Sequence, residues 1–150
     1  MKVREIMTSD VKTCRRETSL AEAVKLMWDR DCGALPIVNS DGTVSGMITD
    51  RDICIAIATR GRTADRIAVG DVAAGQVCTC APDDEAIAAL QTMKSQRVRR
   101  LPVVDANGRL KGILSLNDVV TQGAASATEI VSTIASISEH RRRTAMAAGA

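Results

Sequence analysis

The chain has 150 residues and a mass of 15.9 kDa, which fits one compact domain or two small repeats that share a core. Its 20 basic and 18 acidic residues give a formal net charge of +2, which excludes a strongly basic nucleic-acid binder and an acidic disordered chain. There is one Trp and neither Tyr nor Phe, so the core must be aliphatic and nucleic-acid bases find no stacking platform. The single histidine, His140, leaves almost no material for histidine-based catalysis, and no enzyme is predicted.

The longest stretch without a charged residue, residues 72–82, is shorter than the roughly 18 apolar residues that a membrane-spanning helix needs. Residues 1–10 mix charged and apolar side chains and contain no continuous apolar run, unlike a secretory signal. We therefore expect a cytoplasmic protein with no membrane partner.

The five cysteines include no Cys-x-x-Cys pair, and their odd number without an export signal predicts reduced, mostly buried thiols. Cys78 and Cys80 are two residues apart, so a zinc site built on them needs two further ligands from elsewhere in the chain. No metal site is predicted. A redox or metal sensor that uses Cys14, Cys32, Cys78 and Cys80 stays open as an alternative.

The first predicted elements are a short strand and a helix. Residues 11–14 alternate as a strand does. Ser19 and Glu22 form a capping box, which marks the start of a helix. The apolar stripe of this helix follows at helical spacing: Leu20, Ala23, Val24 and Met27.

A hairpin and a second helix come next. Residues 35–38 and 44–48 are apolar runs on either side of an Asp-Gly turn, which predicts a hairpin with a loop of about five residues. Residues 49–59 favour a helix that ends at Arg60 and Gly61. The polar residues 60–66 then form a connection.

The second half of the chain repeats the first at an offset of 66 residues, without a gap. The offset aligns Cys14 with Cys80, Met27 with Met93, Leu35-Pro36 with Leu101-Pro102, and Gly42 with Gly108. The second copy therefore predicts a strand at 77–80, a helix capped by Asp83 and Asp84 that carries Ile87, Leu90 and Met93, a hairpin of 101–104 and 110–114, and a last helix from Ser115. One copy alone has too little core to be confident of folding, so the two copies should pack together.

Beyond the second copy, residues 129–143 predict a C-terminal amphipathic helix that packs on the module or on a second subunit. Its stripe is Ile130, Ile134, Ile137 and Arg141. The run Arg141-Arg142-Arg143 is interpreted as a charged helix end, and the last residues as frayed.

One constellation, Gly-x-x-(Thr/Ser)-x-x-Asp, occurs once in each copy, at residues 46–52 and 112–118. Thr49 and Ser115 are good N-cap residues, and Asp52 and Asp118 can complete capping boxes, which is a purely structural explanation. The same atoms also suit a nucleotide, because a helix N-terminus favours phosphate and a carboxylate one turn later can accept both hydroxyls of a ribose.

Together these features resemble a tandem pair of CBS domains, often called a Bateman module. The resemblance covers about residues 1–122 and is strongest to small stand-alone bacterial CBS-pair proteins, through the runs at residues 33–37 and 49–53. It implies an α+β, sandwich-like fold of two pseudo-symmetric repeats, each in the order strand, helix, strand, strand, helix, with a C-terminal helix. The expected boundaries are 1–62 for the first CBS domain, 63–66 for the linker, 67–122 for the second CBS domain, and 123–150 for the C-terminal helix and tail.

The resemblance also implies a regulatory module without a catalytic cofactor, which binds adenosine-containing ligands in two clefts. AMP, ADP or ATP are the first candidates, and NAD and S-adenosylmethionine are further ones. Carried over by motif position, Asp52 and Asp118 would bind the ribose diol, while Thr49 and Ser115 would bind ribose or phosphate. The residues expected around adenine and the strands near it are Thr13, Cys14, Ala34, Leu35, Pro36, Thr79, Cys80, Arg100, Leu101 and Pro102. Gly46 and Gly112 are expected to leave room for the ligand.

The two copies differ in their arginines. Arg51 corresponds to Asn117, and the second copy has Arg97, Arg99 and Arg100 where the first has Asp31, Gly33 and Ala34. Each copy thus has a candidate phosphate clamp, although each arginine is explained equally well as a solvated surface charge. We favour a mononucleotide at the Arg51 site, where the neighbouring Asp50 could also neutralise the arginine.

Two alternatives stay open beside the nucleotide sensor. The chain could be an interaction or dimerisation module whose clefts bind no nucleotide, or the cysteine-based sensor described above. The family resemblance also implies a homodimer and an unidentified regulated protein as partners.

Overall fold

The computed structural model describes residues 1–73 and 76–139. In chain order its elements are α1 (Val3–Ile6), α2 (Leu20–Asp29), β1 (Ala34–Val38), β2 (Val44–Thr49), α3 (Asp50–Arg60), two 3-10 turns (Ala64–Arg66 and Val69–Asp71), α4 (Ala86–Gln96), β3 (Arg100–Val104), β4 (Leu110–Ser115), α5 (Leu116–Thr121) and α6 (Ala127–Ser138). Within the described ranges, no helix has both the length and the apolar character needed to cross a membrane.

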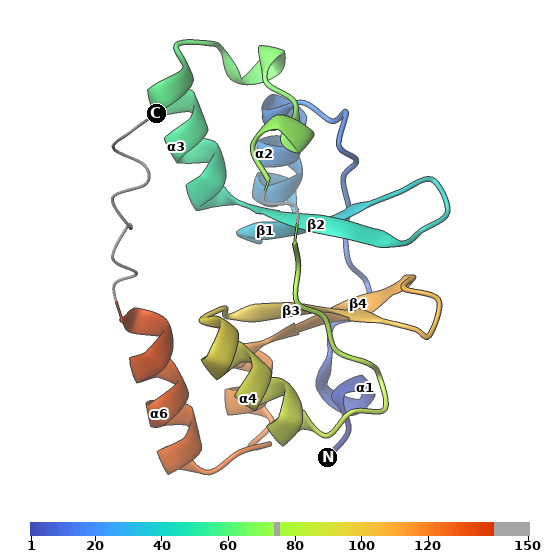
Figure 1. The fold of residues 1–150 in the computed structure, drawn as a ribbon, viewed down its shortest axis with the longest axis vertical. Coiled ribbons are helices and arrows are strands. Elements are labelled where there is room, and N and C mark those ends of the chain that lie inside the picture. The colour runs from blue at the N-terminus through green and yellow to red at the C-terminus, as the bar shows by residue number, and fades with distance from the viewer. Residues whose placement is uncertain (74–75, 140–150) are drawn as a thin grey trace.

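Two antiparallel hairpins, β1–β2 and β3–β4, face each other in the middle of the molecule (Figure 1). Helices α2 and α3 lie beyond the first hairpin, and α1 and α4 lie beyond the second. Ala34 pairs with Thr49 and Arg100 pairs with Ser115, so the two ladders match at the 66-residue offset. Both ladders also shift register at equivalent places, Ile37/Val38 and Val103/Val104. The duplication and the α+β fold class expected from the sequence are confirmed.

The predicted helix caps of the first copy are confirmed. The Ser19 hydroxyl accepts a hydrogen bond from the Glu22 N–H at 3.2 Å, and α2 begins at the next residue. Helix α3 begins after Thr49 and ends at Gly61, whose φ of 60° is the left-handed conformation that glycine adopts without a Cβ penalty.

The predicted cap of the second copy's first helix is wrong, because α4 begins after Glu85 and not after Asp83 or Asp84. The Asp84 carboxylate instead accepts a hydrogen bond from the Ala81 N–H at 2.8 Å, which closes the turn before the helix. Asp83 forms an ion pair with Arg4. Both carboxylates are therefore engaged before the helix starts.

The strand predicted at the start of each copy is wrong beyond a single residue. Cys14 makes one parallel bridge to β1, and its N–H donates to the Pro36 carbonyl at 3.0 Å. The next rung toward the N-terminus would pair the Lys12 carbonyl with the N–H of residue 36, which proline lacks. Cys80 and Pro102 repeat this arrangement at 3.1 Å, so each proline stops the ladder after one rung.

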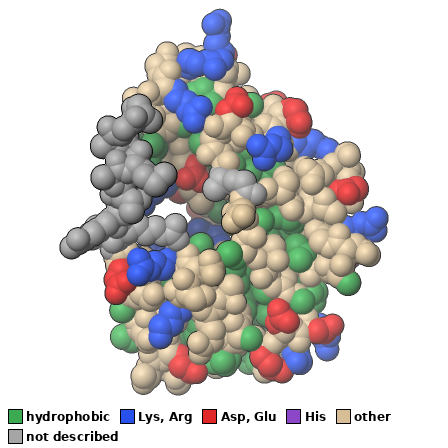
Figure 2. Space-filling view, viewed as in Figure 1, with side chains coloured by type: hydrophobic (Ala, Val, Ile, Leu, Met, Phe, Trp, Pro, Cys, Tyr) green, Lys and Arg blue, Asp and Glu red, His purple; other side chains and the backbone are tan. Residues whose placement is uncertain are grey.

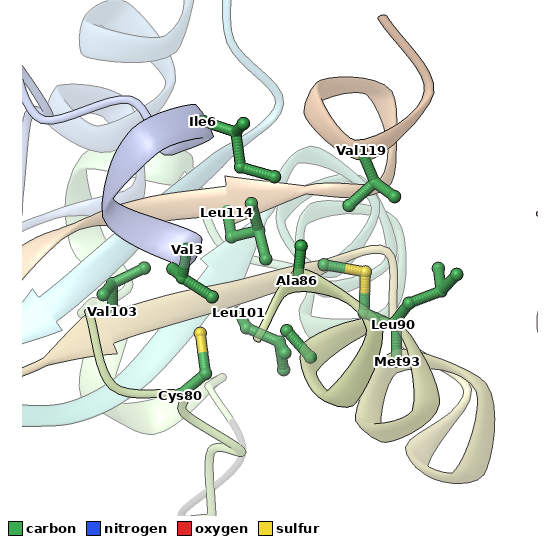
Figure 3. Packing of buried hydrophobic residues seen from close by; sticks show 11 residues of the cluster. Val3, Ile6, Cys80, Ala86, Leu90, Met93, Leu101, Val103, Leu114 and Val119 are labelled. Carbon is green, nitrogen blue, oxygen red and sulfur yellow. The ribbon is translucent and has the colours of Figure 1, made fainter. Parts of the chain in front are cut away.

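The two hydrophobic cores exchange segments. Val3 and Ile6 of α1 lie in the core of the second copy, where they point toward the buried leucines of β3 and β4 (Figure 3). In return, Ile67 and Val69 lie in the core of the first copy. The domain boundaries at residues 62 and 67 stay a prediction. Each core nevertheless contains residues from both sides of these boundaries.

Backbone hydrogen bonds fix each exchanged segment to the helix start that it covers. The Val3 N–H donates to the Asp84 carbonyl at 3.0 Å, just before α4. At the equivalent place, the Val69 N–H donates to the Thr18 carbonyl at 2.8 Å, just before α2. The exchange therefore obeys the same 66-residue relation as the hairpins.

The hairpin loops join the two copies at the opposite end. The Val44 N–H donates to the Gly108 carbonyl at 3.0 Å, and the Leu110 N–H donates to the Gly42 carbonyl at 3.1 Å. Both glycines have a positive φ, 84° at Gly42 and 76° at Gly108. This turn conformation lets the two loops lie side by side.

The predicted apolar stripes are partly confirmed. Leu20, Ala23 and Met27 of α2 are buried, but Val24 is 43% exposed.

The C-terminal helix exists as α6, although its packing face differs from the prediction. Thr133 is buried and the Ser136 hydroxyl donates to the Lys94 carbonyl of α4 at 3.0 Å, whereas Ile134 is exposed. Helix α6 thus packs on α4 through short polar side chains; residues 140–143 of the predicted helix lie outside the described residues.

We expect Val3→Ala to lower the free energy of unfolding by about 2 kcal/mol, because it removes about two buried methylene equivalents and leaves a cavity. Val131→Ala is the matched control, since Val131 is 65% exposed on α6 and should change stability by less than about 0.5 kcal/mol. Urea denaturation of the three proteins measures both values. Equal effects of the two substitutions would contradict the exchanged core.

Candidate functional site

Both motif aspartates cap a helix. In the second copy, Asp118 Oδ2 accepts hydrogen bonds from the Ser115 N–H at 2.8 Å and from the Ser115 hydroxyl at 2.7 Å. In the first copy, Asp52 Oδ2 accepts from the Thr49 N–H at 3.0 Å. No hydrogen bond from the described residues reaches Oδ1 of either aspartate. Oδ2 of each carboxylate therefore holds the helix start, and Oδ1 has no hydrogen bond from the described residues.

Asp118 and Ser115 border a cavity of about 370 Å³ between the two copies. One wall comes from the end of β4 and the start of β3, with Ile113 and Arg100. The other walls come from the first half of the chain: Thr8, Asp10, Val11, Lys12, Arg30, Asp31, Cys32, Gly33 and Ala34. We call this cavity the Asp118 cleft.

The exchanged core explains why residues 8–12 reach the Asp118 cleft. The chain leaves α1 in the second core and joins β1 of the first sheet at Cys14, so the segment between them must cross from one copy to the other. The Thr8 N–H donates to the Ile113 carbonyl and the Ile113 N–H donates to the Thr8 carbonyl, both at 2.9 Å. This pair of hydrogen bonds holds the segment along the edge of β4.

Gly112 lies against this crossing segment. A Cβ at residue 112 would lie 2.6 Å from the Thr8 carbonyl oxygen and 3.0 Å from Met7 Sδ. The prediction that Gly112 leaves room for a ligand is therefore corrected, because the backbone of Thr8 fills the space. Gly46, its counterpart in the first copy, is also buried.

The region around Asp52 is built differently. The positions equivalent to Gly33 and Ala34 of the Asp118 cleft are Arg99 and Arg100, whose long side chains are exposed. Part of the counterpart of residues 8–12 lies in residues 74–75, outside the described residues. Arg51 is exposed, and its N–H donates to Asp50 Oδ1 at 2.9 Å.

Several predicted site residues lie away from the cleft. The side chains of Cys14, Cys80, Leu35 and Leu101 are buried in the two cores, so only their backbone is available to a ligand. The carbonyls of Pro36 and Pro102 already accept hydrogen bonds from Cys14 and Cys80. Thr13 and Thr79, which precede these cysteines, are not among the residues that line the Asp118 cleft.

Of the predicted residues, the structure brings Ala34, Arg100, Ser115 and Asp118 together in one cleft. The sequence analysis missed the residues at 8–12 and 30–33. The sequence around Asp118 contains no motif that points to these residues, because they belong to the other copy and reach Asp118 only in the folded structure. The resemblance to a pseudo-symmetric pair is the one signal in the sequence that points to this arrangement, in which the start of β1 in the first copy lies beside the end of β4 in the second.

A larger cavity of about 630 Å³ adjoins this cleft at Arg100 and Ser115. Its walls combine Arg99 and Asn117 with Ile134 and Ile137 of α6. Helix α6 therefore lies beside Ser115 and Asn117 of the second motif, and it also packs on α4.

The family model named CBS domain matches this chain twice, at residues 3–59 and 69–124. Among curated proteins, the CBS domain-containing protein YhcV of Bacillus subtilis is 35% identical over 117 residues, which cover 78% of this chain and 81% of that protein. A homoserine O-acetyltransferase of Methanococcoides burtonii is 34% identical over 78% of this chain, but the match spans only 23% of the enzyme. The chain likewise spans only 60% of an uncharacterised protein of Methanopyrus kandleri, at 32% identity over 79% of this chain.

Solved structures of similar fold contain different ligands. The CBS domain pair of protein MJ0100, in complex with 5′-methylthioadenosine and S-adenosyl-L-methionine, has a TM-score of 0.75 and 25% identity over 82% of this chain and 95% of that one. CBSX2 in complex with AMP has a TM-score of 0.71 and 25% identity over 81% and 95%. Hypoxic Response Protein I, with two coordinated zinc ions, has a TM-score of 0.74 and 30% identity over 81% and 98%.

The cysteines do not gather into a metal site within the described part of the chain, where no group of three His, Cys, Asp or Glu side chains could hold an ion. Burial raises the pKa of the Cys14 thiol to about 11. Burial, together with the nearby charge of Asp84, raises the pKa of Cys80 to about 12. Cys32 and Cys54 are exposed, so the prediction of mostly buried thiols holds for only part of the set.

We expect Cys14 and Cys80 to resist thiol reagents at pH 8, because a raised pKa keeps a thiol protonated until the pH approaches that value. Cys32 and Cys54 should react first, and Cys32→Ser/Cys54→Ser should remove the fast phase while the two buried thiols react only in denaturant. Mass spectrometry of the labelled peptides measures the order. Rapid labelling of Cys80 in the native protein would favour the redox sensor instead.

Proposed function

The chain belongs to the CBS-domain family as a tandem pair, and we propose that it is a regulatory module that binds an adenosyl ligand and carries out no catalysis. The observation that carries this proposal is the Asp118 cleft. There, a carboxylate that is fixed by its capping box leaves Oδ1 without a hydrogen bond from the described residues, beside a cavity of about 370 Å³. A preorganised acceptor of this kind suits the two hydroxyls of a ribose.

The walls of the cleft match the other parts of an adenosine nucleotide. Val11, Ala34 and Ile113 offer an aliphatic surface for adenine, which agrees with the absence of Tyr and Phe. Lys12 and Arg100 supply positive charge for phosphate. We therefore propose AMP, ADP or ATP as the ligand. NAD and S-adenosylmethionine are further candidates, and the related structures with AMP and S-adenosyl-L-methionine support the adenosyl class.

We further propose that the Asp118 cleft binds before the Asp52 side does, which departs from the preference for Arg51 drawn from the sequence. The reason is the cavity at Asp118, which Gly33 and Ala34 border with almost no side chain and which Lys12 and Arg100 line with positive charge.

A second candidate function is supported by the same capping boxes. Asp52 and Asp118 both stabilise helix starts without a ligand, so the motif would persist in a module that only mediates contacts between proteins. In that case the partners are a second copy of the chain or an unidentified regulated protein, and both clefts stay empty.

We expect one adenosyl compound from a panel of AMP, ADP, ATP, NAD and S-adenosylmethionine to raise the melting temperature. A ligand at about 100 times its Kd adds about 2.7 kcal/mol to the stability of the folded state. Asp118→Asn should weaken that ligand about 10- to 100-fold, because the amide oxygen can still cap α5 while the NH2 group replaces the free acceptor. Titration calorimetry measures the change.

Asp52→Asn is the matched control, because it makes the same substitution in an equivalent capping box. It should leave the tighter binding step unchanged. If Asp52→Asn weakens binding and Asp118→Asn does not, the order of the two sites is reversed. If no compound binds at millimolar concentration, the contact module becomes the better explanation.

A further inference from the structure

The cavity of about 630 Å³ that adjoins the Asp118 cleft has a lining of its own. Asp118, which is proposed to hold a ribose, is not among the described residues that line it. We call it the α6 cavity, because Ile134 and Ile137 of α6 border it. Figure 2 shows a hollow between the two halves of the molecule, with basic side-chain atoms inside it. The volume is typical of small-molecule sites, which range from about 300 to 1,000 Å³.

Four of the side chains that line the α6 cavity are aliphatic: Leu116 and Val120 of α5, and Ile134 and Ile137 of α6. Val120 and Ile134 are each 43% exposed although they border a cavity. Packing of α6 on α4 uses other residues, the buried Thr133 and the Ser136 hydroxyl. The aliphatic lining is therefore available to an apolar group, whose burial there is favourable.

The charge of the α6 cavity is positive. Arg99 and Arg100 are the only charged residues among the described residues that line it. Neither forms an ion pair with a described residue. The carboxylate of Glu139, at the end of α6, is already paired with Arg97 at 2.7 Å. Two guanidinium groups beside an aliphatic lining select an anion that carries an apolar chain.

The two arginines differ in their other neighbours. Arg100 also borders the Asp118 cleft and a third cavity, so it faces acidic groups there as well as the basic groups of Lys12 and Arg30. The acidic residues of those two spaces are Asp10, Asp31, Asp50 and Asp118. Arg99 borders neither space. Arg99 is therefore the cation that belongs to the α6 cavity alone.

The internal repeat shows that the scaffold does not require this lining. The first copy has Gly33 and Ala34 at the positions equivalent to Arg99 and Arg100. It has Asp50 and Cys54 at the positions equivalent to Leu116 and Val120. A 3-10 turn, and not a helix like α6, follows α3. The arginines, the aliphatic residues and α6 therefore occur together in the second copy, as a ligand site would require.

We propose that the α6 cavity binds an anionic amphiphile, a molecule with a carboxylate or phosphate head and an aliphatic chain. The head pairs with Arg99 and Arg100, whose planar guanidinium groups match two oxygens of such a head. The chain covers the four aliphatic side chains. This site is separate from the one proposed for the adenosyl ligand, although Arg100 borders both.

Titration calorimetry of the full chain with hexanoate, octanoate and decanoate, each below its micellar concentration, tests the proposal. We expect the Kd to fall about three- to fourfold for each methylene group that the cavity buries. Octyl phosphate compared with octanoate shows which head binds more tightly. Octylammonium has the same chain with the opposite charge and should bind at least about tenfold more weakly, because it meets two arginines.

Two pairs of variants test the head and the chain separately. Arg99→Gln should weaken octanoate about tenfold, because it removes a charged hydrogen-bond donor. Arg62→Gln makes the same change at an exposed arginine that does not border the cavity, and should have no effect. Ile134→Ser should weaken octanoate at least about fivefold, and Ile134→Leu should retain binding. Val131→Ser is the control on the same helix, since Val131 is 65% exposed and does not border the cavity.

Circular dichroism and urea denaturation check that each variant is folded. Octanoate binding that is the same in Arg99→Gln and Ile134→Ser as in the natural chain would overturn the proposal. Equal affinity for octanoate and octylammonium, or no binding of either anionic head at millimolar concentration, would also overturn it.

Asp118→Asn separates this proposal from that of the adenosyl ligand. It should leave octanoate binding unchanged, so this site stands even if no adenosyl compound binds. Loss of octanoate binding in Asp118→Asn, with the variant folded, would place the anion in the Asp118 cleft and refute the α6 cavity as its site.

Discussion

Neither copy of the repeat closes its own hydrophobic core, and the rest of the structure depends on this constraint. Val3 completes the second core and Val69 completes the first, so each copy is missing a buried residue until the other is present. A single copy of this size has little apolar surface to bury. Because each copy contributes a segment to the core of the other, separating the two copies would remove buried residues from both cores and destabilise both. The hairpin contact at Gly42 and Gly108 joins the copies at the other end.

The exchange also determines the composition of the Asp118 cleft. A segment that begins in one core and ends in the other sheet has to pass the interface, and residues 8–12 do so beside Asp118. A ligand in this cleft would touch both copies and the segment that connects them. Asp118 adds a second link, because its carboxylate holds the start of α5 and the residue also borders the cleft. Binding there would therefore act on the helix start and on the interface together.

Local patterns in the sequence predicted the two hairpins and the Ser19 and Thr49 caps, because each depends on neighbouring residues only, and the 66-residue offset predicted the duplication. The failures have a common physical cause, which is competition from another partner, either nearby in the chain as at Asp84 or far away as at Gly112. Asp84 caps a turn in place of a helix, and Gly112 accommodates the backbone of Thr8 in place of a ligand. The cleft could be assigned only in part, since its second wall comes from the other copy. The short strand before Cys14 is a different kind of failure. Its cause, the missing N–H of Pro36, could have been predicted from the sequence alone.

The duplication is least symmetric along one edge of the molecule. Arg99 and Arg100 occupy the positions equivalent to Gly33 and Ala34, and Lys94 occupies the position equivalent to Trp28. Helix α6 lies on α4, beside the second motif. These differences lie beside the Asp118 cleft and α6, whereas the strand registers and the exchanged valines remain equivalent. A fold held together by symmetric exchange can tolerate this, because the substitutions at the edge leave both cores intact. The common scaffold therefore carries different side chains around its two motifs.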